Sequence, residues 1–311
     1  MDQPIKSAEA TTLPPIDGDV VVITGATASG KSGVALEVAE RIGGEIVSVD
    51  SIAVYRGMDI GTAKPTAAER ALVPHHLIDV VEPHEEYSVA QYVAAAHEKA
   101  AEIRSRGREV LFVGGTPLYL KALLRGLFKG PPADPAFRRG LEEEARDHEP
   151  GWLHARLAEV DPAAAERLHP NDIRRIIRAL EVYEKTGKPM SDWQQQFNKV
   201  PEETGNRVYV LDWPRHELVE RIDRRVDAMF AAGLVEEVRG LMALAPPLGK
   251  TARQAVGYRE VIEHLEGVRG LDETVALVKQ HTRQLAKRQG TWFRSLPESR
   301  YVAAGGRLAS G

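Results

Sequence analysis

The sequence of 311 residues contains no cysteine, which excludes disulfide bonds and zinc sites built from cysteine. It has no apolar run of about 18 residues, the length that a transmembrane helix needs. Residues 1–19 also lack the apolar segment of a signal peptide. The net charge of −4 provides no general attraction to nucleic acid, although local clusters of arginine can still bind phosphates. We therefore expect a soluble cytoplasmic protein without a membrane partner.

Short apolar runs rich in β-branched residues are present instead, and most lead into a helical stretch. We predict strands at residues 20–23, 46–49, 110–113 and 208–211, and helices at residues 32–41 and 88–106. Ser88 is expected to cap the second of these helices and Gly107 to stop it. This alternation predicts an α/β fold, with a parallel sheet flanked by helices. Because ligands bind at the carboxyl ends of such strands, we expect Ser32, Asp50 and Thr116 to lie close together.

From residue 130 to residue 199, strand patterns disappear and charged helical segments dominate. One helix is predicted to begin at Asn171 and to end at Gly187. Its predicted apolar face is Ile173, Ile176, Ile177 and Leu180. We therefore predict an all-helical insertion domain, residues 130–199, within a core domain made of residues 19–129 and 200–300. Residues 1–18 are expected to form a disordered leader, and residues 301–311 a flexible tail.

The turn after the first strand carries a phosphate-binding pattern. Gly25, Ala26, Thr27, Ala28, Ser29, Gly30, Lys31 and Ser32 match G-x-x-x-x-G-K-[ST] between a strand and a helix. Glycines let the backbone N–H groups turn toward an anion, Lys31 supplies a cation and Ser32 can ligate Mg²⁺. The loop indicates a diphosphate group but not a reaction, so kinases and NTPases are the default interpretation. The third strand, however, leads into Gly114, Gly115 and Thr116 rather than into the acid that such enzymes use.

Asp50 follows the second strand at the same predicted edge of the sheet. There it can act as a general base or support Mg²⁺ through water. An aspartate followed by serine is also a common turn or helix cap. Thr116, followed by Pro117, is likewise typical of a helix N-cap. The residues alone leave both alternatives open at both positions.

Seven segments resemble the bacterial tRNA dimethylallyltransferase family, whose members are also called tRNA isopentenyltransferases. They are GATASGKS at 25–32, DSIAVYRGMDIGTAKP at 50–65, PHHLID at 74–79, VGGTPLYLKALLRGL at 113–127, LHPNDIRRIIRALE at 168–181, AVGYRE at 255–260 and TRQLAKRQGTWFR at 282–294. Several of these segments are unrelated to generic P-loop proteins. One departure is Ala53, where many relatives carry glutamine. The resemblance implies a P-loop NTPase-like core with a helical insertion. We expect the protein to be a monomer.

The resemblance also implies a reaction. The N6 amine of adenine 37, beside the anticodon of tRNA, attacks C1 of dimethylallyl diphosphate, and diphosphate leaves. Asp50 would then be the base, with Thr116, Lys31 and Arg225 as further catalytic residues and Mg²⁺ held at Ser32. The phosphate loop would hold the departing diphosphate rather than a nucleoside triphosphate. The target nucleotide would have to be flipped into a channel through the core.

The resemblance further implies contacts with the anticodon stem-loop. The residues concerned are Asp50, Ser51, Ile52, Ala53, Thr116, Arg138, Arg174, Arg175, Arg178, Gly257, Tyr258, Arg259, Lys287, Arg288, Trp292 and Arg294. Pattern alone favours simpler roles for some of them. The arginines of the helix after Asn171 are typical of a solvated helix face. Trp292 and the neighbouring Phe293 are typical of core anchors, although aromatic and basic residues together also suit RNA.

Three other functions share the phosphate loop. A small-molecule or nucleotide kinase would transfer phosphate from ATP. An adenylate isopentenyltransferase would prenylate free AMP, ADP or ATP, but it would not need the basic helical insertion. A P-loop protein that only binds RNA would never consume the prenyl donor.

Overall fold

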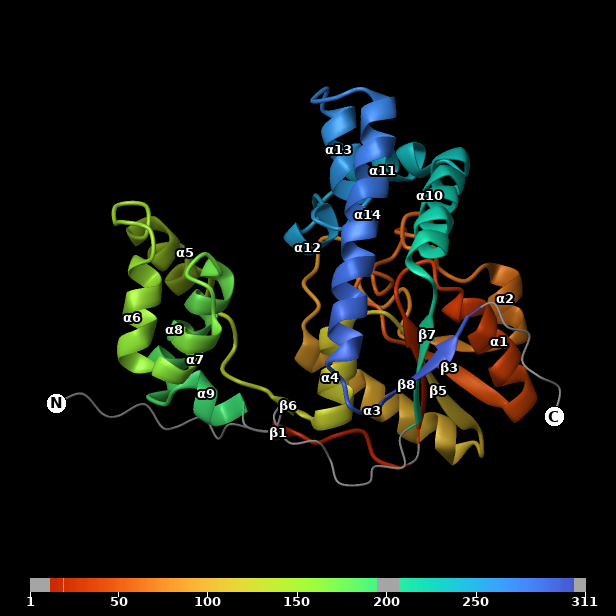
Figure 1. Cartoon of the computed structure of the whole chain (residues 1–311), viewed down its shortest axis with the longest axis horizontal. Helices are drawn as coiled ribbons and strands as arrows, with labels where there is room; N and C mark the ends of the chain where they lie inside the picture. Colours follow the sequence, from red (N-terminus) through yellow and green to blue (C-terminus); the bar gives the residue numbers. More distant parts are fainter. Residues whose placement is uncertain (1–11, 19, 195–206, 305–311) are drawn as a thin grey trace. The chain divides into compact units, whose positions relative to one another are not determined.

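The computed structural model describes residues 12–18, 20–194 and 207–304 (Figure 1). The chain divides into two compact units. A sheet-containing unit comprises Ile16–Leu124 and Pro201–Gly311, and a helical unit comprises Met1–Pro15 and Arg125–Val200. The helical unit therefore begins at Arg125 rather than at residue 130, and it also includes the described residues 12–15.

The sheet has six strands in the order β4-β3-β5-β2-β7-β8, and all neighbouring strands are parallel. The strands are β2 (Val21–Gly25), β3 (Gly44–Ser48), β4 (His75–His76), β5 (Glu109–Gly114), β7 (Arg207–Asp212) and β8 (Ser299–Ala303). The predicted α/β class is confirmed, as are the four predicted strands within one or two residues at each end. β2, β3 and β5 are largely buried, which explains their nearly continuous apolar sequences.

Nine described helices accompany the sheet. They are α1 (Lys31–Ile42), α2 (Ala67–Leu72), α3 (Val89–Ser105), α4 (Pro117–Arg125), α10 (Arg215–Ala231), α11 (Leu234–Met242), α12 (Lys250–Arg253), α13 (Tyr258–Leu265) and α14 (Leu271–Arg294). Ser88 caps α3 as predicted, because its hydroxyl accepts the Gln91 N–H. None of the described helices is long and apolar enough to span a membrane.

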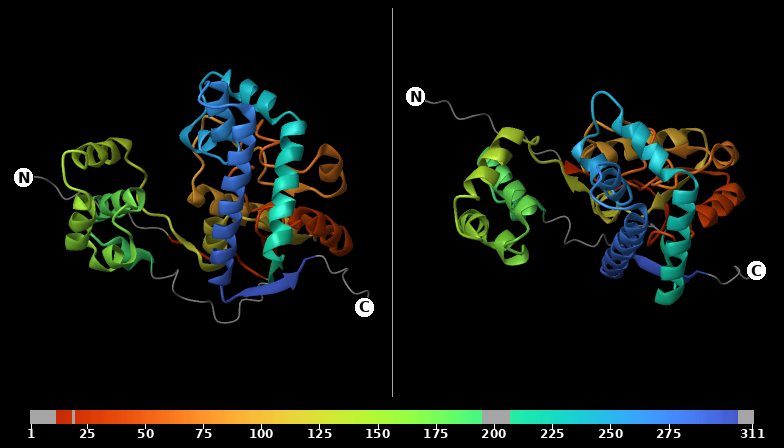
Figure 2. Two further views of the ribbon diagram at one scale, coloured as in Figure 1. Left: turned by 45° about the horizontal axis from the view of Figure 1, so that its top comes forward. Right: turned by 90° about the horizontal axis from the view of Figure 1, so that it is seen from above.

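The helices α10 and α14 lie side by side in every view (Figure 2). Two ion pairs join them. Arg283 contacts Asp223 at 2.7 Å, and Lys279 contacts Asp227 at 2.7 Å. The two ion pairs therefore hold α10 and α14 together. Both helices supply residues to the site described below.

The predicted leader and tail are partly wrong. Residues 12–18 are ordered: β1 (Thr12–Leu13) pairs antiparallel with β6 (Leu127–Phe128). Ile16 is buried, and its N–H donates to the Leu123 carbonyl at 2.7 Å. The predicted tail begins inside β8, which continues to Ala303 and pairs with β7. These short edge strands carry little apolar patterning, so only long-range pairing identifies them. Residues 1–11 and 305–311 lie outside the described residues.

The helical unit contains α5 (Pro135–Glu144), α6 (Trp152–Val160), α7 (Pro162–Arg167), α8 (Ile173–Thr186) and α9 (Met190–Trp193). Gly187 ends α8 in a left-handed conformation, as predicted, but the N-cap is Asp172 rather than Asn171. Ile173 is 38% exposed and does not belong to the apolar face, because burial along α8 begins only at Ile176.

Candidate active site

The phosphate loop connects the end of β2 at Gly25 to the start of α1 at Lys31. Gly30 and Ala28 both have positive φ, 85° and 64°, which folds the loop tightly. Gly30 occupies the N-cap of α1 without any side-chain cap. The first N–H groups of α1 therefore remain available to an external acceptor, as in anion sites at helix N-termini.

Two side chains that follow β7 hold the loop from outside. The Trp213 Nε1–H donates to the Ser29 carbonyl at 2.8 Å, and the Arg221 Nε–H donates to the Ala28 carbonyl at 2.9 Å. The Arg221 guanidinium lies 4.2 Å from the centre of the Trp213 ring. These two hydrogen bonds favour this conformation of the loop in the absence of a ligand. No sequence pattern points to either residue.

Lys31 and Arg225 place two positive charges close together at the loop. Burial, together with Arg225, lowers the pKa of Lys31 to about 8, although Asp50 opposes this effect. Burial also lowers the pKa of Arg225, again opposed by Asp50. Among the described residues, neither cation forms an ion pair, and Lys31 Nζ only approaches the Ala26 carbonyl at 3.5 Å. The arrangement therefore favours an anionic ligand.

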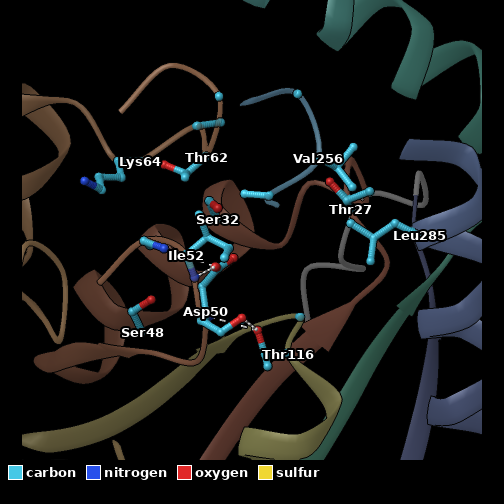
Figure 3. A pocket seen from close by; sticks show the side chains of 18 of the residues that line it. Thr27, Ser32, Ser48, Asp50, Ile52, Thr62, Lys64, Thr116, Val256 and Leu285 are labelled. Carbon is cyan, nitrogen blue, oxygen red and sulfur yellow. Dashed lines mark hydrogen bonds between the residues drawn. The ribbon is translucent and has the colours of Figure 1, made fainter. Parts of the chain in front are cut away.

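Asp50 follows β3 and faces the same space (Figure 3). Its Oδ1 accepts the N–H groups of Ile52 at 2.8 Å and Ala53 at 3.2 Å. The turn-cap interpretation of Asp50 is thereby confirmed. No described residue hydrogen-bonds to Oδ2, however, so the same carboxylate can still accept a proton from a ligand.

Thr116 fixes the backbone on both sides of Asp50. Its N–H donates to the Val49 carbonyl at 3.1 Å, and its hydroxyl accepts the Ser51 N–H at 3.0 Å. It also directly precedes α4, which begins at Pro117 as predicted. Thr116 therefore links the carboxyl ends of β3 and β5, so the expected meeting of Asp50 and Thr116 is confirmed.

A cavity of about 690 Å³ joins these groups. The predicted site residues that line it are Thr27, Gly30, Lys31, Ser32, Asp50, Ser51, Ile52, Ala53, Thr116, Arg225, Gly257 and Tyr258. In the view of Figure 3, Ser32, Asp50 and Thr116 lie between Thr27 on one side and Lys64 on the other. Gly25, Ala26, Ala28 and Ser29 support the loop without lining this cavity.

Tyr258, which the resemblance assigns to tRNA binding, is buried in the core. Its hydroxyl donates to Glu237 at 2.7 Å, and Glu237 also accepts the Ile60 N–H at 2.7 Å. Burial and the neighbouring Glu237 carboxylate raise the pKa of Tyr258. A Cβ atom at Gly61 would lie only 2.5 Å from the Tyr258 ring. Tyr258 therefore shapes one wall of the cavity and joins the 59–61 loop to α11.

The remaining predicted residues of this unit lie outside the cavity. Arg259, Lys287, Arg288 and Arg294 are exposed, and Arg259 contacts Glu260 at 2.7 Å. The half-buried Trp292 packs edge-on against the buried Phe293, with ring centres 5.8 Å apart. The core-anchor interpretation of this aromatic pair is therefore confirmed for Phe293 and holds in part for Trp292.

In the helical unit, two predicted tRNA contacts surround a fully buried carboxylate, Glu181. Arg138 donates to it twice, at 2.9 and 2.7 Å, and Arg178 also contacts it. Burial would raise the pKa of Glu181, but hydrogen bonds from Arg138, the Asp134 N–H and Arg178 outweigh burial and lower it. The other two arginines, Arg174 and Arg175, are exposed, and Arg175 lies 3.4 Å from Asp172.

We expect Glu181→Gln to lower the free energy of unfolding by roughly 2 kcal/mol, because it removes the charge from these hydrogen bonds. Since the folded-state pKa is lowered, this stability is present above the ordinary pKa of glutamate. It is lost as the pH falls through the lowered value. Urea unfolding of the wild type and of Glu181→Gln at several pH values measures this difference in the free energy of unfolding. Glu184→Gln, on the exposed face of α8, is the control; equal effects of the two changes would contradict the prediction.

The fold and the site define a P-loop-type α/β protein whose anion-binding loop opens, together with a carboxylate, into one cavity. A family model described as "IPP transferase" matches residues 53–296, and one described as "Isopentenyl transferase" matches residues 18–79. A tRNA dimethylallyltransferase of Rhodopirellula baltica is 50% identical, with 92% of this chain and 88% of the relative covered. One of Geobacter metallireducens is 49% identical, with 94% of both covered.

Solved structures of similar proteins point to the same family. The tRNA isopentenylpyrophosphate transferase of Bacillus halodurans is 38% identical, with a TM-score of 0.66, and covers 93% of this chain and 90% of its own. A eukaryotic dimethylallyltransferase acting on tRNA is 29% identical, with a TM-score of 0.76 and coverage of 93% and 74%. The chain therefore belongs to the tRNA dimethylallyltransferase family and is a prenyltransferase.

Proposed function

We propose that this protein transfers the dimethylallyl group of dimethylallyl diphosphate to N6 of adenine 37 of tRNA. The products are N6-dimethylallyladenosine and diphosphate. The observation that carries the proposal is that Lys31, Arg225 and Asp50 line one and the same cavity. A single chain supplies all of these residues, so the proposal needs no second copy.

On the donor side, the bond between C1 and the diphosphate oxygen breaks, and negative charge develops on the leaving group. Groups that are fixed in advance around such charge usually provide the largest part of catalysis. The loop N–H groups, Lys31 and Arg225 would stabilise the diphosphate as it departs. The loop is already held by Trp213 and Arg221, so little reorganisation is needed.

On the acceptor side, the N6 amine is a weak nucleophile because its lone pair is delocalised into the purine ring. Asp50 would accept the N6 proton on Oδ2 as the new C–N bond forms, while its Oδ1 stays bound to the backbone. The base must leave the stack to reach this carboxylate, at a cost of a few kcal/mol. Thr116 would keep Asp50 in place.

The donor set also fits Mg²⁺. In phosphate-loop proteins, Mg²⁺ is bound by the serine or threonine of the loop together with phosphate oxygens, and it keeps several waters. Ser32 lines the cavity at the start of α1, and the described residues contain no metal-binding cluster of three or more His, Cys, Asp or Glu. Ser32 would hold the ion, and Mg²⁺ would neutralise part of the diphosphate charge.

The tRNA contacts remain part of the proposal. In the sheet-containing unit, exposed Lys287, Arg288 and Arg294 suit phosphates of the anticodon stem-loop. In the helical unit, exposed Arg174 and Arg175 suit the same role. Arg138 and Arg178 would contribute mainly by holding Glu181 and thus the shape of α8.

The test is incubation of the purified protein with labelled dimethylallyl diphosphate, Mg²⁺ and unmodified tRNA, followed by nucleoside analysis. We expect N6-dimethylallyladenosine at position 37. Parallel reactions with free AMP and with ATP plus small-molecule acceptors test the alternatives. Phosphate transfer from ATP without any modified nucleoside would overturn the proposal.

A further inference from the structure

Gln289 of α14 bridges two segments of the site that are far apart in the sequence. Its Oε1 accepts the Thr27 N–H of the phosphate loop at 2.9 Å. Its Nε2 donates to the Gly115 carbonyl, beyond β5, at 2.7 Å. Both distances are typical of good hydrogen bonds. The residue is 8% exposed and lines the cavity, so water has little opportunity to replace these contacts.

The absence of a side chain at Gly115 makes this bridge possible. A Cβ atom there would lie 2.8 Å from Gln289 Nε2 and 3.3 Å from the Gly25 carbonyl. The backbone conformation of Gly115 does not itself require glycine, because its φ lies outside the left-handed region. The close approach of α14 to this backbone is therefore the reason for a glycine at position 115.

The bridge continues directly to Asp50. Gly115 precedes Thr116, and Thr116 holds the backbone on both sides of Asp50 through Val49 and Ser51. The phosphate loop is thus connected, through the Gln289 amide and then the Gly115–Thr116 backbone, to the segment that carries the carboxylate.

This geometry matters because a transfer reaction depends on the separation between the leaving group and the incoming nucleophile. A misplacement of about 1 Å can cost about 100-fold in rate. We propose that Gln289 is a positioning residue, which fixes the phosphate loop relative to Asp50 and thereby aligns donor and acceptor. The inference rests on the proposed function for its effect on rate, but the bridge itself does not.

The main test compares Gln289→Met with Gln284→Met. Methionine keeps the length of the side chain and removes both hydrogen bonds, while Gln284 is an exposed residue of the same helix. We expect Gln289→Met to lower the single-turnover rate by about 10- to 100-fold. The tRNA dissociation constant should stay within about twofold, and Gln284→Met should match the wild type. A wild-type rate for stable Gln289→Met would overturn the proposal.

A second variant approaches the bridge from the other side. Gly115→Ala places a methyl group against the Gln289 amide and should reduce the rate in the same way. Because both changes break one connection, the double variant should be no slower than the slower single variant. Multiplied losses would mean that the two residues act separately, which contradicts the proposal. Gly115→Ala also decides the question if Gln289→Met does not fold.

Amide hydrogen exchange separates this inference from the proposed function. Loss of the bridge should accelerate exchange at the Thr27 N–H, with or without catalysis. If the wild type makes no prenylated tRNA but exchange accelerates in Gln289→Met, the proposed function fails and the bridge stands. If the wild type is active while rate and exchange are both unchanged in the variant, the bridge fails and the function stands.

Discussion

We expect Asp50→Asn to lower the single-turnover rate of prenyl transfer by about 10²–10⁴, the usual contribution of a general base. Asparagine retains an oxygen that can accept the N–H groups of Ile52 and Ala53, so the turn should persist. The loss would therefore report the missing proton acceptor. Rapid-quench assays with saturating donor and tRNA measure it, while filter binding should show unchanged affinity for tRNA.

Two further variants make this result interpretable. Asp17→Asn changes an exposed aspartate of the same unit and should leave the rate unchanged. Asp50→Ala removes both the base and the turn cap, and should be at least as slow as Asp50→Asn. If Asp50→Asn instead weakened tRNA binding in proportion to the rate, Asp50 would position RNA rather than accept a proton.

The second large effect is expected for Lys31→Ala, which removes the half-buried cation from the phosphate loop. Removing one fixed group that stabilises developing charge commonly costs about 10²–10³ in rate. We expect a loss of that size together with weaker binding of inorganic diphosphate, measured by calorimetry in the presence of Mg²⁺. An unchanged affinity for diphosphate would show that Lys31 does not contact the leaving group.

The pKa of Lys31, lowered to about 8, adds a pH dependence. In the free protein Lys31 is charged below this pKa and neutral above it, so the Lys31 contribution to diphosphate affinity falls as the pH rises from 7 to 9. Arginine stays charged throughout this range, so Lys31→Arg should not show this decrease. The comparison also cancels the titration of diphosphate itself. Identical pH profiles for the two proteins would contradict the assignment.

The parts of the site that were predicted from sequence are encoded locally. The phosphate loop has a fixed spacing, and Asp50 and Thr116 each follow an apolar strand. The rule that ligands bind at strand ends then brings them together. The resemblance to a family added roles that no pattern could assign, above all for Arg225.

The features that could not be predicted from the sequence depend on contacts between distant segments. Trp213 and Arg221 act on a loop about 190 positions earlier in the chain, and Gln289 joins two segments that are themselves far apart. Glu181, an ordinary helical glutamate by sequence, binds Arg138 and also Arg178, whose pattern is typical of a solvated helix face. A single sequence carries no sign of such pairings.

The close approach of Gly61 to the Tyr258 ring restricts which substitutions these two positions can accept. A larger residue at position 61 would collide with the ring, while loss of the ring would leave Glu237 without one of its donors. Either change made alone would therefore disturb this contact. We therefore expect residues 61 and 258 to change together among related proteins, although nearly 200 positions separate them in the sequence.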